Sequence, residues 1–276
     1  MTETERSIIV ATDLSARCDR AVDRAVMLGK QLQARIHVVH VTKPVTSVTE
    51  QDVRATLADP EEDVDVLLPV GAVPQTILRL ANESSADAII TSVARFNSVE
   101  DFFLGTAVDH LVRRSTIPVL VAKQRPHRFY EKLLIATDLS PQSRKAFIKA
   151  AELFPAADLH LLHAIHMPFE SWLRSEHDRA QVRADAQAKL EEFLQHPSIP
   201  EDIVKRATIN LGEGSADEVV GKAIAEWRPD LIVLGTEGAG GVKRAMLGST
   251  ASSLLNWIPT DTLVVHNSMD DGDDEA

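Results

Sequence analysis

The chain lacks several features on which common classes of protein depend. It has one cysteine, Cys18, so an internal disulfide and a cysteine-based zinc cluster are excluded, which is typical of a reducing compartment. Aromatic residues make up only 4% of the sequence, so a row of base-stacking side chains is not expected. No apolar run approaches the roughly 18–20 residues that cross a bilayer. The opening residues, MTETERS, also lack the apolar segment of a signal peptide. We therefore expect a cytoplasmic protein with no membrane partner.

Positive charge is also scarce, with 29 Lys and Arg against 41 Asp and Glu and a net charge of −12. An acidic chain without a basic run is a poor candidate for binding nucleic acid or an anionic membrane. The last eight residues, 269–276, are MDDGDDEA, and we expect them to form a solvated, disordered tail. The composition of the chain as a whole, with 44% hydrophobic and 25% charged residues, is ordinary for a globular protein.

Two copies of one pattern organise the 276 residues. SIIVATDLS at 7–15 returns as KLLIATDLS at 132–140, and LGTAVDHLV at 104–112 returns as LGSTASSLL at 247–255. The offset grows from 125 to 143 residues, which predicts an 18-residue insertion in the second copy, between its second and third strands. We expect a first domain at 1–124, a linker at 125–129, a second domain at 130–268 and the acidic tail after it.

Short apolar runs alternate with amphipathic stretches in both copies, which predicts an α/β fold with a parallel sheet covered on both faces. Ser140 and Pro141 suit the N-cap and first turn of a helix that runs to about Phe154. In the first copy the middle helix is reduced to about 46–57. For the second copy we expect strands at 133–137, 159–165, 204–211, 231–235 and 262–266 and helices at 141–154, 171–194, 215–227 and from about 248.

The most specific local pattern is a glycine-rich segment at 235–250, GTEGAGGVKRAMLGST. Gly235 ends a strand at the edge where α/β sheets bind ligands, and Gly238 allows a ligand to approach the backbone. Gly248 and Ser249 begin a helix, whose first N–H groups and positive dipole end suit phosphate. A flexible glycine-rich turn is the simpler interpretation, but the strand before and the helix after favour an anion site.

With the repeated ATDLS segment, this Gly-x-x-Gly-(x9)-Gly-Ser pattern resembles the universal stress protein family in its tandem two-domain form, over about 6–123 and 130–267. The resemblance implies two Rossmann-like domains of the adenine nucleotide alpha hydrolase-like type. Each would have a five-stranded parallel sheet of order 3-2-1-4-5 with helices on both faces. It further implies an intramolecular pseudo-dimer through the last strands of the two domains, and it allows two chains to pair as a homodimer.

In that family the glycine pattern marks members that bind ATP. By resemblance, Asp138 would meet the ribose or a metal-bridged phosphate, and Ala164 would offer backbone groups to the adenine. Mg2+ or Mn2+ would accompany the triphosphate, although no dedicated metal ligands are visible in the sequence. The ribose and phosphates would be held by Gly235, Gly238, Gly248 and Ser249.

The first copy departs from the pattern where the phosphates would lie. In the second copy Lys243 and Arg244 can add positive charge to the loop, whereas the matching residues of the first copy are Glu100 and Asp101. Two carboxylates beside a triphosphate are strongly unfavourable. We therefore predict that only the second domain binds nucleotide, although the first keeps Asp13.

Other polar residues point to no catalytic site. His160, His163 and His166 cannot converge from one strand, so they are interpreted as strand-edge histidines and not as metal ligands. Cys18 is interpreted as a buried or inert thiol. No general base is identifiable beside the phosphates, so any ATP hydrolysis would be slow.

The leading hypothesis is an ATP-binding stress-response regulator or sensor. One alternative is an adaptor that uses a non-nucleotide ligand or protein contacts, with Phe96, Phe102 and Phe103 as a candidate apolar surface. A second alternative, an ATP-dependent transferase of the related α/β proteins, lacks its S-G-G-x-D-S loop.

Overall fold

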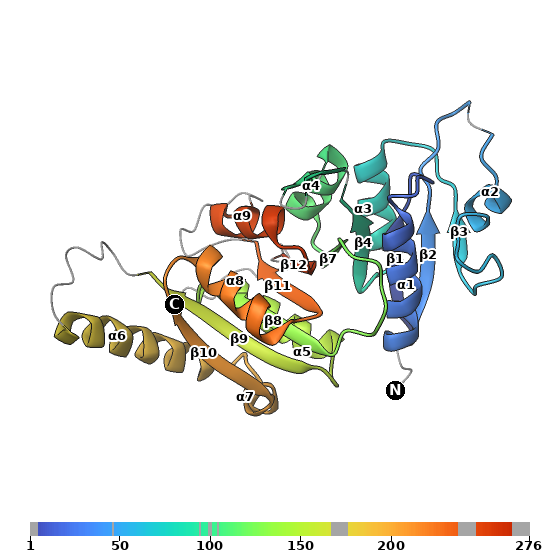
Figure 1. Cartoon of the computed structure of the whole chain (residues 1–276). Coiled ribbons are helices and arrows are strands. Elements are labelled where there is room, and N and C mark those ends of the chain that lie inside the picture. The colour runs from blue at the N-terminus through green and yellow to red at the C-terminus, as the bar shows by residue number, and fades with distance from the viewer. Residues whose placement is uncertain are drawn as a thin grey trace. The chain divides into compact units, whose positions relative to one another are not determined.

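A computed structural model of the chain describes residues 5–45, 47–93, 95–98, 101–103, 105–166, 176–236 and 247–266. Of residues 95–98, 101–103 and 176–178 only the backbone is described. Contacts divide the chain into two compact units (Figure 1), unit 1 with Met1–Phe129 and Asn256–Ala276, and unit 2 with Tyr130–Leu255. The expected tail at 269–276 lies outside the described residues.

Unit 1 has a sheet of order β12-β7-β4-β1-β2-β3, in which the strands of the first copy run parallel. Numbered along the first copy alone, this is the expected order 3-2-1-4-5. The strands are β1 (Arg6–Ala11), β2 (Ala34–Val39), β3 (Asp65–Leu67), β4 (Ala88–Ser92), β7 (Val119–Ala122) and β12 (Asp261–Val265). The helices are α1 (Asp19–Leu32), α2 (Glu50–Arg54), α3 (Val73–Glu83) and α4 (Thr106–Arg114).

The last strand of the second copy belongs to unit 1. Residues Thr262–Val264 of β12 pair with Val119–Val121 of β7 in antiparallel register. The last strand of the second copy therefore pairs with the last strand of the first within the sheet of unit 1.

Unit 2 has four parallel strands in the order β10-β9-β8-β11, which are the first four positions of the same order. The strands are β8 (Lys132–Thr137), β9 (Asp158–Ile165), β10 (Ala207–Glu213) and β11 (Leu231–Gly235). The helices are α5 (Pro141–Leu153), α6 (Glu176–Leu194), α7 (Glu201–Arg206), α8 (Ala216–Trp227) and α9 (Ser249–Trp257), the last two residues of which fall in unit 1.

Helices α5 and α8 lie on opposite faces of this sheet. Thr137 of β8 contacts Ser143 of α5, whereas His160 of β9 packs edge-on against Trp227 of α8. His160 is in register with Leu134, three residues from Thr137, and side chains alternate along a strand. The two helices therefore cover different faces, as expected for an α/β domain.

Helix α5 begins as the sequence predicts. The Ser140 side chain accepts the Ser143 N–H at 3.2 Å, and Pro141 is the first helical residue, where its missing N–H has no cost.

One expectation about the elements is wrong. The strand predicted at 204–211 begins only at Ala207, because residues 201–206 form α7. That segment has Glu201 and Asp202 in its first turn and Lys205 and Arg206 in its last, an arrangement that suits the helix dipole. The first copy also contains a hairpin, β5 (Arg95–Ser98) and β6 (Asp101–Phe103), which the sequence did not predict.

The sequence contains no apolar run long enough to cross a bilayer, and the helices can be compared with that statement. Within the described ranges, no helix has both the length and the apolar character that a bilayer-spanning segment needs.

Candidate functional site

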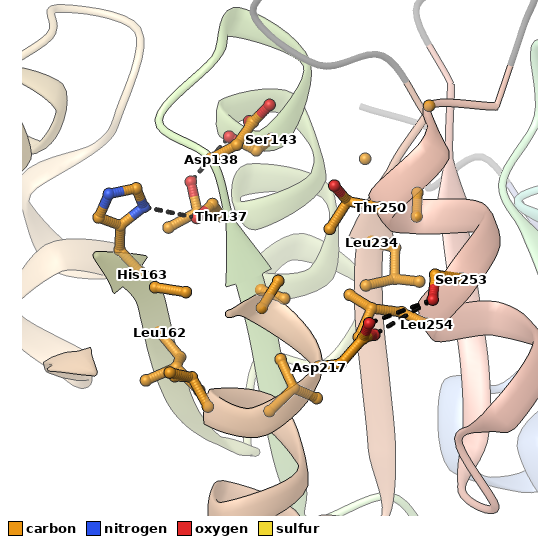
Figure 2. A pocket seen from close by; sticks show the side chains of 18 of the residues that line it. Thr137, Asp138, Ser143, Leu162, His163, Asp217, Leu234, Thr250, Ser253 and Leu254 are labelled. Atoms are coloured by element: carbon orange, nitrogen blue, oxygen red, sulfur yellow. Dashed lines mark hydrogen bonds between the residues drawn. The ribbon is translucent and has the colours of Figure 1, made fainter. Parts of the chain in front are cut away.

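A cavity of about 900 Å³ lies at the carboxyl-end edge of the sheet in unit 2 (Figure 2). Its walls come from the ends of β8, β9 and β11, from the residues that lead into α8, and from the first turns of α9. The strand order of unit 2 reverses between β8 and β11. Open α/β sheets bind ligands outside the strand ends at such a point.

Five of the eight predicted site residues line this cavity and are therefore brought together: Asp138, Ala164, Gly235, Gly248 and Ser249. The other three lie outside the described residues: Gly238, Lys243 and Arg244.

The turn between β8 and α5 holds Asp138 at the cavity. Leu139 has a positive φ of 65° and donates its N–H to the Thr137 hydroxyl at 2.9 Å. One oxygen of the exposed Asp138 carboxylate accepts the Ser140 N–H at 3.0 Å. These bonds fix the backbone, so the carboxylate has a defined position at the strand end.

Gly235 is explained by packing against α5. A Cβ at this position would lie 3.0 Å from the Ser143 nitrogen and 3.1 Å from the Gln142 carbonyl carbon, which are backbone atoms of the first turn of α5. The sequence singled out Gly235 as a ligand contact, but this approach between helix and strand also requires a glycine.

Gly235→Ala is therefore expected to lower the free energy of unfolding by about 1–3 kcal/mol, the usual cost of overpacking. Urea denaturation of the full chain measures the loss. An unchanged midpoint would show that the first turn of α5 moves away without cost.

The first turn of α9 supplies backbone donors to the cavity. Gly248 donates its N–H to the Thr236 carbonyl at 2.6 Å, and the Ser252 N–H binds the Gly248 carbonyl at 2.8 Å. The N–H groups of Ser249, Thr250 and Ala251 lie in the first turn and have no partner within the helix. All three residues line the cavity, so this wall is suited to an anion.

His163 lines the cavity, and the sequence analysis did not predict its hydrogen bond to the first strand. Its Nδ1 lies 2.8 Å from the Thr137 carbonyl oxygen, and because a carbonyl only accepts, Nδ1 carries the proton. In unit 1 His40 makes the same contact with the Thr12 carbonyl at 3.0 Å. The repeated segments HVVHV at 37–41 and HLLHA at 160–164 were the available signal. In both copies this histidine ties the end of the second strand to the end of the first.

The matching carboxylate of unit 1 is engaged by its own neighbours. Asp13 accepts hydrogen bonds from the hydroxyl of Ser15 and, at 3.1 Å, from the thiol of Cys18, and it forms an ion pair with Arg17 at 3.4 Å. Burial raises the pKa of Asp13, but the hydrogen bonds and the Arg17 charge outweigh it, so the pKa is lowered. The thiol of Cys18 has a raised pKa, mainly through burial, which argues against a nucleophile.

The second copy has Gln142 and Ser143 where the first has Arg17 and Cys18. No cation therefore stands at the position from which Arg17 reaches the carboxylate. The two copies differ in this respect as well as in the loop after the fourth strand.

Comparison with known proteins agrees with this architecture. The model of the Universal stress protein family matches residues 5–123 and again 129–266. A protein of Staphylococcus aureus strain USA300, described as a universal stress protein, is 27% identical over 142 residues, which cover 44% of this chain and 85% of that protein.

Two solved structures share the fold over most of the chain. A universal stress protein from Archaeoglobus fulgidus has a TM-score of 0.67 at 18% identity, covering 95% of this chain and 98% of that chain. A protein of unknown function from Pseudomonas aeruginosa PAO1 has a TM-score of 0.67 at 21% identity, covering 95% and 93%. Because the family model matches both copies of the repeat, the chain belongs to the universal stress protein family.

Proposed function

We propose that the second copy binds ATP in the cavity of unit 2. The observation that carries the proposal is the wall formed by α9, because Ser249, Thr250 and Ala251, whose N–H groups have no partner within the helix, line a cavity that Asp138 also lines. A cavity of about 900 Å³ is within the usual range for ligand sites of 300–1,000 Å³.

The proposed ligand contacts follow the sequence prediction. The first turn of α9, with Gly248 and Ser249, takes the phosphates, to which Lys243 and Arg244 add positive charge. Gly235 and Gly238 lie beside the ribose and phosphates, and the backbone of Ala164 meets the adenine.

The carboxylate of Asp138 suits a divalent cation. Mg2+ in nucleotide sites is held by one or two carboxylates together with phosphate oxygens and water. Within the described residues, no group of three His, Cys, Asp or Glu side chains could hold a metal ion. Asp138 is therefore proposed as the protein ligand of Mg2+ or Mn2+, which would neutralise phosphate charge.

We further propose that the first copy binds no ATP. Its carboxylate, Asp13, is already paired with Arg17, and Glu100 and Asp101 replace the two cations of the second copy.

The proposed role is a stress-response regulator or sensor in the cytoplasm, with slow ATP hydrolysis or none. The proposed domain limits are 1–124 and 130–268, and two such chains would form a homodimer.

The first experiment identifies the ligand. The purified full chain is denatured and the released nucleotide is identified by mass spectrometry, and titration with ATP and magnesium gives the number of sites. ATP or ADP is expected at about one per chain. Two equivalent sites would refute the assignment to the second copy, and no binding at millimolar ATP would favour an adaptor.

The second experiment places a carboxylate at the first residue of α9. Ser249→Asp is expected to weaken ATP binding about 1,000-fold, since like charges near 4 Å repel by about 4 kcal/mol at an effective dielectric of 20 and each 1.4 kcal/mol is tenfold. An acid at a helix N-terminus stabilises the helix, so loss of folding would not explain the result. The matched control, Thr106→Asp in α4 of the first copy, should leave ATP affinity unchanged. Equal effects of the two variants would contradict the proposal.

A further inference from the structure

The cavity of unit 2 has a second carboxylate, which the roles above do not use. Asp217 is the second residue of α8 and lines the cavity. Figure 2 shows its side chain directed toward Ser253 of α9.

Ser253 is one hydrogen-bond partner of this carboxylate. Its hydroxyl lies 3.3 Å from each carboxylate oxygen of Asp217, so one donor is shared between two acceptors. Both distances exceed the usual 2.5–3.0 Å of an O–H···O bond. A carboxylate offers about four acceptor positions, so a ligand hydroxyl can add to this contact or compete with it.

The position of Asp217 along α9 indicates which part of a nucleotide it meets. Ser253 follows Ser249 by four residues, so both lie on one face of α9 about one helical turn, or 5.4 Å, apart. The next residue, Leu254, belongs to a wall of buried aliphatic side chains. That wall consists of Leu162, Val219, Val220, Leu234 and Leu254.

Along α9 the cavity thus changes from anion donors to a carboxylate–hydroxyl pair and then to an apolar surface. A ligand hydroxyl that donates to this carboxylate offsets the repulsion between the carboxylate and a triphosphate one turn away. In a nucleotide the ribose hydroxyls lie between the phosphates and the apolar base. Acidic residues bind ribose hydroxyls in the same way in other nucleotide-binding α/β folds.

We propose, on the basis of the proposed ATP site, that Asp217 determines specificity by accepting hydrogen bonds from the ribose hydroxyls. The second copy then selects ribonucleotides over deoxyribonucleotides. With this assignment, Asp138 binds the metal ion beside the phosphates. The resemblance alone allowed Asp138 to contact either the ribose or a metal-bridged phosphate.

The first copy cannot make this arrangement. Pro74 and His110 stand where the second copy has Asp217 and Ser253. The wall differs as well, because buried Thr76 and Thr91 replace Val219 and Leu234. The specificity determinant is therefore a feature of the second copy.

The test measures ATP and 2′-deoxy-ATP affinities of the full chain in the presence of magnesium. ATP is expected to bind about tenfold more tightly, the effect of one hydrogen bond to a charged group. Asp217→Ala should reduce this ratio to about one by weakening ATP more than 2′-deoxy-ATP, which keeps only the 3′-hydroxyl as a donor to Asp217. A ratio of affinities is not altered by a general loss of stability.

The matched control is Asp202→Ala, which removes an exposed acid from the first turn of α7, outside the cavity, and should keep the tenfold ratio. If the ratio persists in Asp217→Ala, or if the unmodified chain binds both nucleotides equally, the role of Asp217 is refuted and the ATP site stands. If neither nucleotide binds, both proposals fail.

Discussion

Replacing Asp261 with alanine is expected to lower the free energy of unfolding of unit 1 by about 3–5 kcal/mol, the cost of breaking a buried ion pair. Asp261 begins β12 and is only 1% exposed. One carboxylate oxygen accepts the backbone N–H groups of Lys123 and Gln124 at 2.7 and 3.0 Å. The other forms an ion pair with Arg24 at 3.0 Å.

The loss is large because the remaining groups stay buried. Arg24 is 5% exposed, so without Asp261 its buried guanidinium loses the carboxylate with which it forms an ion pair. Lys123, which is 2% exposed, loses the charge that favours its protonated form, and the backbone N–H groups of Lys123 and Gln124 lose their acceptor.

Hydrogen–deuterium exchange of peptides from β7 and β12 measures this effect on unit 1 by itself, since a chain with two compact units need not unfold in one step. The control is Glu201→Ala, which breaks the exposed pair with Lys205 at 2.8 Å and should cost less than about 1 kcal/mol. If exchange in β7 and β12 changed no more in Asp261→Ala than in the control, the cluster would not hold β12 in place.

The repeat made the fold predictable from one sequence. Once SIIVATDLS and KLLIATDLS are aligned, each predicted strand in one copy can be checked against the equivalent segment of the other. Two weak sequence patterns at equivalent positions together predict a strand more strongly than either does alone. Local capping chemistry was also readable, as Ser140 and Pro141 show. The strand prediction failed at residues 204–206 because a segment this short has too little periodicity to distinguish the start of a strand from the end of a short helix.

The site was predictable where residues adjacent in sequence act together, as Gly248 and Ser249 do at the start of α9. It was not predictable where partners come from different elements. Asp217 and Ser253 are 36 residues apart, and neither belongs to the glycine pattern. Gly235 shows a third case. The sequence pattern predicts a ligand contact at this glycine, but its close packing against α5 depends on the three-dimensional structure and has no signal in the sequence.

Buried charges were the least predictable feature. Arg24, Lys123 and Asp261 look like surface residues in the sequence, since charged side chains are rarely buried unless paired. Asp261 is 138 residues from Lys123, so no local pattern links them. The net charge of −12 therefore conceals a buried cluster that links the first residue of β12 to α1 and to the residues after β7.

Lys123 should also make the stability of unit 1 rise with pH. Burial lowers the pKa of Lys123 from 10.5 to about 7, with Asp261 partly opposing the shift. Between these values the unfolded chain binds a proton that the folded chain has lost, so the free energy of unfolding increases as pH rises. Each pH unit in this window adds at most 1.36 kcal/mol, so about 2 kcal/mol is expected between pH 7 and 9.

The window is chosen so that other groups do not interfere. Burial lowers the pKa of His266 to about 4, which is below it. Above pH 9 the thiol of Cys18, whose pKa burial raises from 9.0, would act in the opposite direction.

Exchange in β7 and β12, followed from pH 7 to 9 and corrected for the intrinsic pH dependence of exchange, measures the slope. Lys123→Met keeps the length of the side chain and removes the titrating group. The variant should lose the rise that the unmodified chain shows. Parallel profiles of the two proteins would mean that Lys123 stays charged in the folded state, with Asp261 and the Ile258 carbonyl compensating its burial.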